Sequence, residues 1–401
     1  MIGGTGLAVG ITVGAPLAAR MGGTGIAGLG QSASVVGTAL IAIPVARLMT
    51  ARGRRPGLGA AYIIGVIGAV LVLLAATWHS VPLLFVGLFL FGGGNTANLQ
   101  ARYAAVDLAE PSRRGQQLSF VIWATTIGSV AGPNLAQLAD RSVRRFGAVE
   151  YSGPFAFSAL AFVLCAVIVL VALRPDPLLV ARALAPAAGP EAAADRADAP
   201  AARGLKAAAR ELRSSPGARL GVVAMLVGHS VMIAVMSMTP VHIDAGGHPD
   251  ALRVMGIVLS VHIAGMYALA PVTGWLADRL GRRPVILGGI ALLLAACAVA
   301  GLSGHDTRAL VVGLFLLGLG WSGTMVAGST LVTESVGLGN RASAQGLADT
   351  VTGMGGALAA ALAGVVMAWS SFGVLSAFAA ILTVPLLAAT LRPARQLGVS
   401  G

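Results

Sequence analysis

Residues 274–284 read GWLADRLGRRP, and this stretch is the best guide to the fold. Its last four residues, GRRP at 281–284, recur at 53–56, an offset of 228 residues. Both copies follow an apolar stretch of about 20 residues, the length that crosses a bilayer as a helix. The repeated tetrapeptide therefore predicts that two parts of the chain share one pattern of helices and loops.

A second repeat has nearly the same offset. Asp107 is followed seven residues later by Arg114, and Glu334 is followed at the same spacing by Arg341, 227 residues further along the chain. Two unrelated patterns with almost equal offsets indicate an internal duplication. Parallel repeats of this kind are typical of transporters whose substrate site lies near the middle of the membrane, between the two repeats.

The composition predicts a polytopic membrane protein. Hydrophobic residues make up 56% of the 401, charged residues make up 10%, and the mean hydropathy is +0.85. The short alternating strands of an outer-membrane barrel are absent from the sequence. Twelve apolar stretches are long enough to span a membrane as helices, near 2–19, 25–46, 58–78, 81–101, 117–139, 153–173, 218–240, 252–276, 284–303, 308–331, 343–368 and 371–391.

The basic residues predict the orientation. A net charge of +12 is compatible with a nucleic-acid partner, but the placement of the charges argues against one. With the N-terminus inside, 21 of the 27 Lys and Arg residues fall on the cytoplasmic side. This asymmetry is the positive-inside rule, and it predicts that both termini lie inside.

The duplication and the charges together predict the domains. We expect a six-helix bundle over 1–174, a cytoplasmic linker over 175–216 and a second six-helix bundle over 217–401. Within the linker, 185–200 is expected to be flexible, and 201–213 to form an amphipathic helix on the membrane surface. Because the repeat supplies both halves within one chain, a monomer is expected, with the lipid bilayer as its surroundings.

The stretch 274–284 resembles the signature loop of the major facilitator superfamily. This resemblance implies an all-α fold of two pseudo-symmetric six-helix bundles and transport by alternating access. It also implies gating roles for a set of charged loop residues, namely Asp278, Arg282, Arg283, Arg54 and Arg55. The first copy departs from the family pattern, because Thr50 stands where the second copy has Asp278. We therefore expect the gate to depend more on the second copy.

Soft metal ligands occur at helical spacing in two consecutive spans. Met232 and Met236 are four residues apart, as are His262 and Met266, so each pair shares a helix face. Thioether and imidazole groups suit Cu(I) better than they suit hard cations. Against this interpretation, methionine is a common core residue, whereas histidine is expensive in hydrocarbon and usually faces a cavity. Three further residues extend the pattern: His229, Met238 and His242.

The two spaced pairs, within a transporter of this superfamily, resemble the motifs of the CcoA-like copper importers. This resemblance implies uptake of a copper ion across the bacterial cytoplasmic membrane, with Met232, Met236, His262 and Met266 as its ligands. Copper is then the cargo, and no resident cofactor is expected. No pattern of an enzyme active site or phosphate-binding loop occurs, so enzymatic activity is not expected.

A proton-coupled exporter of drugs or other small molecules is the alternative. Gly128-x3-Gly132-Pro133 partly resembles the antiporter motif of that branch of the superfamily, although Ala136 and Gln137 stand where the motif has paired glycines. A glycine-proline pair in a membrane helix also arises from close packing alone, so both interpretations stay open here.

Few other polar residues lie within the predicted spans. Asp349 is a candidate for proton coupling or for packing near the cytoplasmic interface. The cysteines Cys165 and Cys297 are expected to be core residues, because they lack the spacing of a soft-metal clamp. Four amides are candidates for the cavity wall or for hydrogen bonds between helices: Asn95, Asn98, Gln100 and Asn134.

Overall fold

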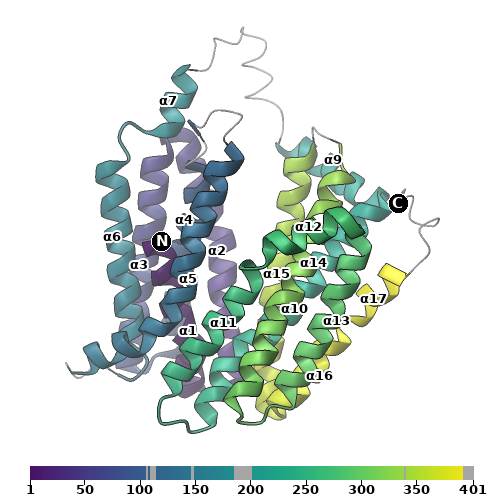
Figure 1. The fold of residues 1–401 in the computed structure, drawn as a ribbon. Helices are drawn as coiled ribbons and strands as arrows, with labels where there is room; N and C mark the ends of the chain where they lie inside the picture. The colour runs from purple at the N-terminus through teal and green to yellow at the C-terminus, as the bar shows by residue number, and fades with distance from the viewer. Residues whose placement is uncertain (105–106, 109–113, 146–148, 185–200, 338–339, 392–401) are drawn as a thin grey trace. The chain divides into compact units, whose positions relative to one another are not determined.

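The structure is a computed structural model that describes residues 1–104, 107–108, 114–145, 149–184, 201–337 and 340–391. Throughout these ranges the regular structure is helical, and no strand is present (Figure 1). The all-α membrane fold predicted from the sequence is thereby confirmed. The predicted flexible linker 185–200 lies outside the described residues.

Six of the first seven helices follow the predicted spans closely, and the short seventh helix lies within the predicted linker 175–216. They are α1 (Ile2–Gly22), α2 (Thr24–Arg52), α3 (Arg54–Trp78), α4 (Val81–Ala104), α5 (Arg114–Arg144), α6 (Gly153–Ala172) and the short α7 (Pro177–Leu184). The later helices are α9 (Ala201–Ser214), α10 (Pro216–Ala245), α11 (Ala251–Tyr267), α12 (Ala270–Leu280), α13 (Arg282–Gly301), α14 (Thr307–Glu334), α15 (Arg341–Trp369), α16 (Phe372–Ile381) and α17 (Val384–Leu391).

Eleven helical segments of the described chain are long and apolar enough to cross a membrane. The remaining predicted span, near 117–139, falls on α5, which has 31 residues. The amphipathic helix predicted over 201–213 is α9. Its Ala208 and Leu212 are buried, whereas Lys206 and Arg210 are exposed, as the alternation of faces on a helix requires.

The repeated glycine of the GRRP segments ends a helix in both copies. Gly53 follows α2 with φ 97°, and Gly281 follows α12 with φ 92°. A Cβ is strongly disfavoured at these angles, so glycine is the residue that lets the chain leave one helix and begin the next without a longer loop. The duplicated sequence therefore encodes a duplicated turn.

The described chain separates into two compact units. Unit 1 comprises 1–186, 237–263 and 360–369, and unit 2 comprises 187–236, 264–359 and 370–401. Unit 1 thus contains the first predicted bundle together with the end of α10, most of α11 and the end of α15. The predicted boundaries at 174 and 217 concern a different division of the chain, and they stay a prediction.

The core of unit 1 is built around aromatic rings. Helix α3 packs against α4 and α6, and α1 packs against α5 and α6. Phe91 lies 5.4 Å from the ring of Phe155 in an edge-to-face arrangement, and the same distance from the ring of Phe162. Tyr62 adds a further ring contact with Phe162 at 6.1 Å. These side chains fill the space that the small residues of the neighbouring helices leave.

Helices α2 and α4 touch through their backbones. A Cβ added at Gly37 would overlap the carbonyl oxygen of Phe89, and a Cβ added at Gly92 would lie 2.5 Å from the carbonyl oxygen of Ser34. Small residues allow this close approach of membrane helices.

Replacing Gly37 with valine is expected to destabilise the protein by about 3 kcal/mol or more, because neither backbone can move aside. Thermal unfolding in detergent, followed by size-exclusion chromatography, checks this expectation. The matched control is Gly288→Val on α13, where a Cβ meets nothing within 4 Å. Equal unfolding midpoints for the two variants would contradict the close contact between α2 and α4.

Span eight is broken in the structure. The predicted span 252–276 forms two helices, α11 and α12, separated by a turn at Ala268 and Leu269. Pro271 lies at the start of α12, where its missing N–H and fixed φ are tolerated, and it does not continue the helix before it. By contrast, Pro44 lies inside α2, which stays continuous. The predicted span near 252–276 is therefore confirmed as Ala251–Leu280, but it consists of two helices rather than one.

Candidate functional site

A cluster of three ring side chains lies in unit 2. The indole Nε1–H of Trp321 on α14 donates a hydrogen bond to Nδ1 of His229 on α10, at 3.1 Å. Tyr267, the last residue of α11, packs edge to face on the ring of Trp321, with 5.7 Å between the ring centroids. Trp321 thus contacts both other rings, and three helices contribute to the cluster.

Two members of the cluster lie near the centres of their helices, and the third lies beside a helix break. His229 and Trp321 are close to the midpoints of α10 and α14, and Tyr267 immediately precedes the break between α11 and α12. Discontinuous helices near the membrane midplane are a recurrent feature of substrate sites in secondary transporters. Tyr267 is 39% exposed, so the residue is not enclosed by the chain.

A glycine on α15 makes room for the imidazole. A Cβ at Gly356 would lie 2.7 Å from Cδ2 and 2.8 Å from Nε2 of His229, so a side chain there would force the imidazole to shift. The α15 backbone can therefore approach the Nε2 edge of the ring directly. Four helices of unit 2 position the cluster: α10, α11, α14 and α15.

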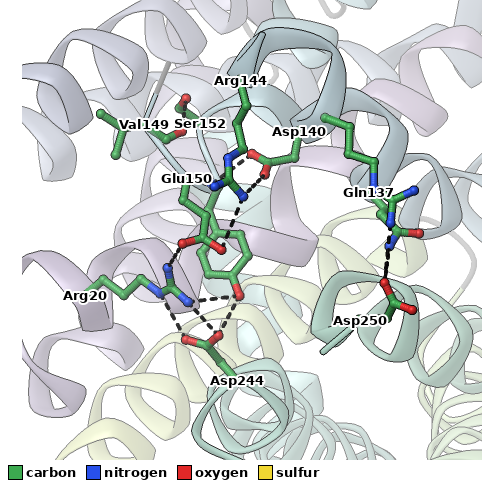
Figure 2. A network of polar contacts seen from close by, with 11 residues as sticks. Arg20, Gln137, Asp140, Arg144, Val149, Glu150, Ser152, Asp244 and Asp250 are labelled. Carbon is green, nitrogen blue, oxygen red and sulfur yellow. Dashed lines mark hydrogen bonds and ion pairs between the residues drawn. The ribbon is translucent and has the colours of Figure 1, made fainter. Parts of the chain in front are cut away.

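A charged network lies in unit 1 at the end of α1 (Figure 2). Arg20 holds both carboxylate oxygens of Asp244, at 3.1 and 2.9 Å, and also pairs with Glu150. Tyr151 donates its hydroxyl hydrogen to Asp244, and the guanidinium of Arg20 lies 4.2 Å from the centre of the Tyr151 ring. Burial and the bond to Asp244 raise the pKa of the Tyr151 phenol, so the group remains a donor.

The same network fixes the segment between α5 and α6. The buried carboxylate of Asp140 accepts the backbone N–H of Tyr151 at 2.9 Å, and Arg144 pairs with Glu150 at 3.7 Å. The end of α10 is thereby tied to the end of α1 and to the start of α6. Charge-assisted bonds of this kind are stronger than neutral ones.

Two further contacts join α5 to the segment that follows α10. Gln137 donates to Asp250 at 2.9 Å (Figure 2), and the amide of Asn134 donates to the hydroxyl of Ser260 on α11 at 2.7 Å. Asn134, a candidate for the cavity wall, thus makes a hydrogen bond between helices. Gly128 and Gly132 of the antiporter-like segment are required for packing, because a Cβ at either position would overlap α1.

The two repeated sequence patterns meet in space. In unit 1, Arg54 makes two hydrogen bonds with Asp107, at 2.8 and 3.1 Å. In unit 2, Arg282 makes two with Glu334, at 3.1 and 2.6 Å. Each pair joins the arginine of a GRRP segment to the carboxylate that recurs at the second offset. The duplication thus specifies one contact twice.

The predicted gating residues differ in their surroundings. Asp278 is exposed and pairs with Arg282 at 3.2 Å, one turn away, and it does not cap α13. Arg55 donates to the carbonyl oxygen of Leu170, and Arg283 is half-buried. The roles of these residues in gating stay a prediction.

Because the Arg54 pair is more buried than the Arg282 pair, its loss is expected to cost more. The side chains of Arg54 and Asp107 are 17% and 11% exposed, against 24% and 49% for Arg282 and Glu334. Arg54→Gln should destabilise the protein by about 2–3 kcal/mol and Arg282→Gln by about 1 kcal/mol. The thermal unfolding midpoints of the two variants, compared with that of the parent, report both losses of stability. The double variant Arg54→Gln/Asp107→Asn should recover part of the loss, and a larger loss from Arg282→Gln would contradict this ranking.

The residues proposed as copper ligands divide between the units. Met232, Met236 and Met266 belong to unit 2, whereas His262 belongs to unit 1 together with Met238 and His242. Met232, Met266, His262 and Met238 are buried, and Met236 and His242 are half-buried. Within the described residues, no group of three or more His, Cys, Asp or Glu side chains is arranged to hold a metal ion. Copper ligation stays a prediction.

The remaining polar candidates lie in varied surroundings. Asn98 accepts from the hydroxyl of Tyr62 at 3.1 Å, and Asn95 donates to Thr38 at 3.4 Å. Gln100 is half-buried and Asp349 is exposed. Both cysteines are buried, in agreement with a core position. The roles of the amides in a cavity wall, and of Asp349 in coupling, stay predictions.

The model of the Major Facilitator Superfamily matches residues 2–253 and again 248–399, which together cover almost the whole chain. The chain belongs to the major facilitator superfamily. Members of the superfamily are membrane transporters, so the protein is a multi-pass transporter.

Three similar proteins illustrate its relationships within the major facilitator superfamily. The chain is 40% identical to the uncharacterized MFS-type transporter YdeG of Bacillus subtilis, over 96% of this chain and 88% of that protein. It is 28% identical to the riboflavin transporter RfnT of Brucella anthropi, over 79% of this chain and 73% of the relative. A solved structure of a variant of the nucleoside transporter NupG superposes with a TM-score of 0.72 at 16% identity, covering 97% of this chain and 98% of that one, and this likeness concerns the fold.

Sequence reasoning did not find Trp321, Tyr267 or the Arg20 network. His229 was singled out, but its partner lies 92 residues away on α14. A usable signal exists for each residue: Trp321 is a lone indole within an apolar span, and Arg20 is a lone charge at the end of one. An isolated polar group in an apolar segment needs a partner, although the sequence does not say which.

Proposed function

We propose that this protein is a secondary transporter of small organic solutes with a planar ring, and that the solute binds against Trp321, Tyr267 and His229. The observation that carries the proposal is the ring cluster at the break of span eight. Flat, rigid side chains with a polar edge suit a flat ligand that is apolar on its faces and polar at its rim.

Two further points support this function. The cluster combines an edge-to-face aromatic pair with an imidazole, so it offers both ring contacts and a hydrogen-bonding group at one place. In addition, the relative RfnT is a riboflavin transporter, and riboflavin has a planar ring system. The proposal concerns the class of solute, and it includes riboflavin as the first compound to test.

Transport by the purified protein in proteoliposomes tests the proposal. Radiolabelled riboflavin and a phenylpropionate serve as ring-bearing solutes, glucose serves as the control without a planar ring, and empty liposomes give the background. Accumulation of at least one ring-bearing solute, with glucose at background, is the expected result. Background levels for both ring-bearing solutes, with the protein shown to be folded, would contradict the proposal.

Copper uptake is the second candidate function. The observation in its favour is that Met232 and Met236 lie one turn apart on the single helix α10, so the two thioethers share a face. Copper accumulation in a bacterial strain lacking its own importer tests this function, with His262→Ala and Met232→Ala at equal expression. Uptake by the parent and its loss in both variants would favour copper, and equal accumulation with and without the protein would remove it.

A further inference from the structure

We infer that Trp321 holds His229 in the neutral tautomer protonated at Nε2, so that the imidazole presents a hydrogen-bond donor to the ligand. The ligand group beside it is then an oxygen acceptor, such as a carboxylate or a ring carbonyl, and not a metal ion. This inference rests on the proposed function, because it names the part of the solute that lies next to the ring.

The hydrogen bond to Trp321 decides the tautomer. An indole Nε1–H can only donate, so Nδ1 of His229, at 3.1 Å, must be the accepting nitrogen and carries no hydrogen. A neutral imidazole has one protonated nitrogen, which is therefore Nε2. An imidazolium has hydrogens on both nitrogens and would face the indole donor with a second donor. The bond thus excludes both the charged form and the other tautomer.

The Nε2–H group is left for a ligand. Among the described residues, the hydrogen bond from Trp321 is the one that His229 makes, and the imidazole is half-buried rather than enclosed. A Cβ at Gly356 would lie 2.8 Å from this nitrogen, so the α15 backbone packs close to one side of the ring and no side chain lies between them. An acceptor oxygen on a ligand would satisfy this donor.

The same tautomer disfavours a metal ion at His229. Metals bind the lone pair of a neutral imidazole nitrogen. The lone pair on Nδ1 is occupied by the indole N–H, and Nε2 has a hydrogen in place of a lone pair. Binding through Nε2 would require the hydrogen to move to Nδ1, where it would point at the N–H of Trp321. The bond to Trp321 must break before His229 can bind copper.

The adjoining rings complete the description of the ligand. Tyr267 lies edge to face with Trp321 and is partly exposed, so a planar group can pack against this pair while an oxygen atom reaches Nε2 of His229. The solute class narrows to ring compounds with an oxygen acceptor at the rim. Trp321 thus has two roles in this proposal: it positions His229, and it contacts the planar ring of the solute.

Nitrogen NMR of the full-length protein in lipid nanodiscs tests the inference. The histidine imidazoles are labelled with ¹⁵N, and the His229 signals are identified by their loss in His229→Gln. The wild-type signals are expected to show a neutral ring protonated at Nε2. Trp321→Phe keeps an aromatic ring and removes the N–H, so it should give a mixture of the two tautomers, a change that a merely structural role of Trp321 would not produce.

Three probes test the ligand class. Benzoate, a ring with a carboxylate, is expected to shift the protonated nitrogen of His229, whereas benzylamine, a ring without an acceptor oxygen, and Cu(I) should leave it unchanged. Protonation at Nδ1, a charged ring, a shift with Cu(I), or no response to benzoate would each overturn the inference. These results leave the proposed function standing if ring-bearing solutes are transported, and absence of that transport removes the proposed function whatever the tautomer.

Discussion

Replacing Trp321 with alanine is expected to reduce transport of the best ring-bearing solute at least tenfold. The substitution removes the ring that contacts both Tyr267 and His229, and with it the donor to Nδ1. An aromatic pair contributes about 0.5–1.5 kcal/mol beyond the burial of its area, and about 1.4 kcal/mol corresponds to a factor of ten in affinity. Loss of ring contact together with the hydrogen bond therefore exceeds that factor.

Initial rates in proteoliposomes, measured over a range of solute concentrations, check this expectation. The matched control is Trp275→Ala on α12, because Trp275 is 54% exposed and contacts Arg279 rather than the cluster. That control should transport at close to the parental rate. Equal losses in the two variants would show that any tryptophan in unit 2 matters, and a fully active Trp321→Ala protein would remove the cluster as the site.

Replacing Asp244 with alanine is expected to open the segment that its network holds together. The carboxylate binds Arg20 through two bonds and Tyr151 through a third, so three charge-assisted contacts are lost at once. Because the side chain of Arg20 is 40% exposed, solvent weakens these bonds. The substitution is therefore expected to reduce the free energy that keeps the segment closed by about 1–2 kcal/mol. A loss of this size raises the open population about tenfold.

Maleimide labelling reports this opening. Ser152 is buried next to Tyr151, so Ser152→Cys, in a protein whose Cys165 and Cys297 are replaced by serine, should react slowly. Adding Asp244→Ala should raise the labelling rate about tenfold. The control is Asp250→Ala, which removes an exposed pair with Arg141 at 3.4 Å and the bond from Gln137. Unchanged labelling in Asp244→Ala would contradict the role of the network.

Much of the fold can be predicted from the sequence, for physical reasons. A bilayer requires continuous apolar helices of a fixed minimum length, so the spans are visible as runs of apolar residues. The ion pairs Arg54–Asp107 and Arg282–Glu334 could be inferred from the sequence, because each of the two patterns occurs twice. The break in the predicted span 252–276 could not be inferred from the sequence. A proline alone does not show where a helix breaks, because Pro44 lies inside the continuous α2 whereas Pro271 follows a turn.

The site was harder to predict than the fold. His229 and Trp321 are 92 residues apart in the sequence and lie on different helices. Arg20 and Asp244 are 224 residues apart in the sequence. Spacing along one helix shows which residues share a face, but it does not show which face meets another helix. The methionine pairs illustrate the difference, because Met232 and Met266 have the spacing of ligands and the burial of core residues.

Asp176 gives the turn of the first copy an acidic partner from outside the repeated segment. Where the second copy has Asp278, the first has Thr50, yet the start of α3 still has an acidic partner, since the backbone N–H of Arg55 donates to Asp176 at 2.7 Å. That carboxylate comes from just after α6, outside the repeated segment. The two copies thus have acidic partners of different kinds: Asp176 accepts from a backbone N–H, whereas Asp278 pairs with the side chain of Arg282, and comparison of the loops alone would miss Asp176.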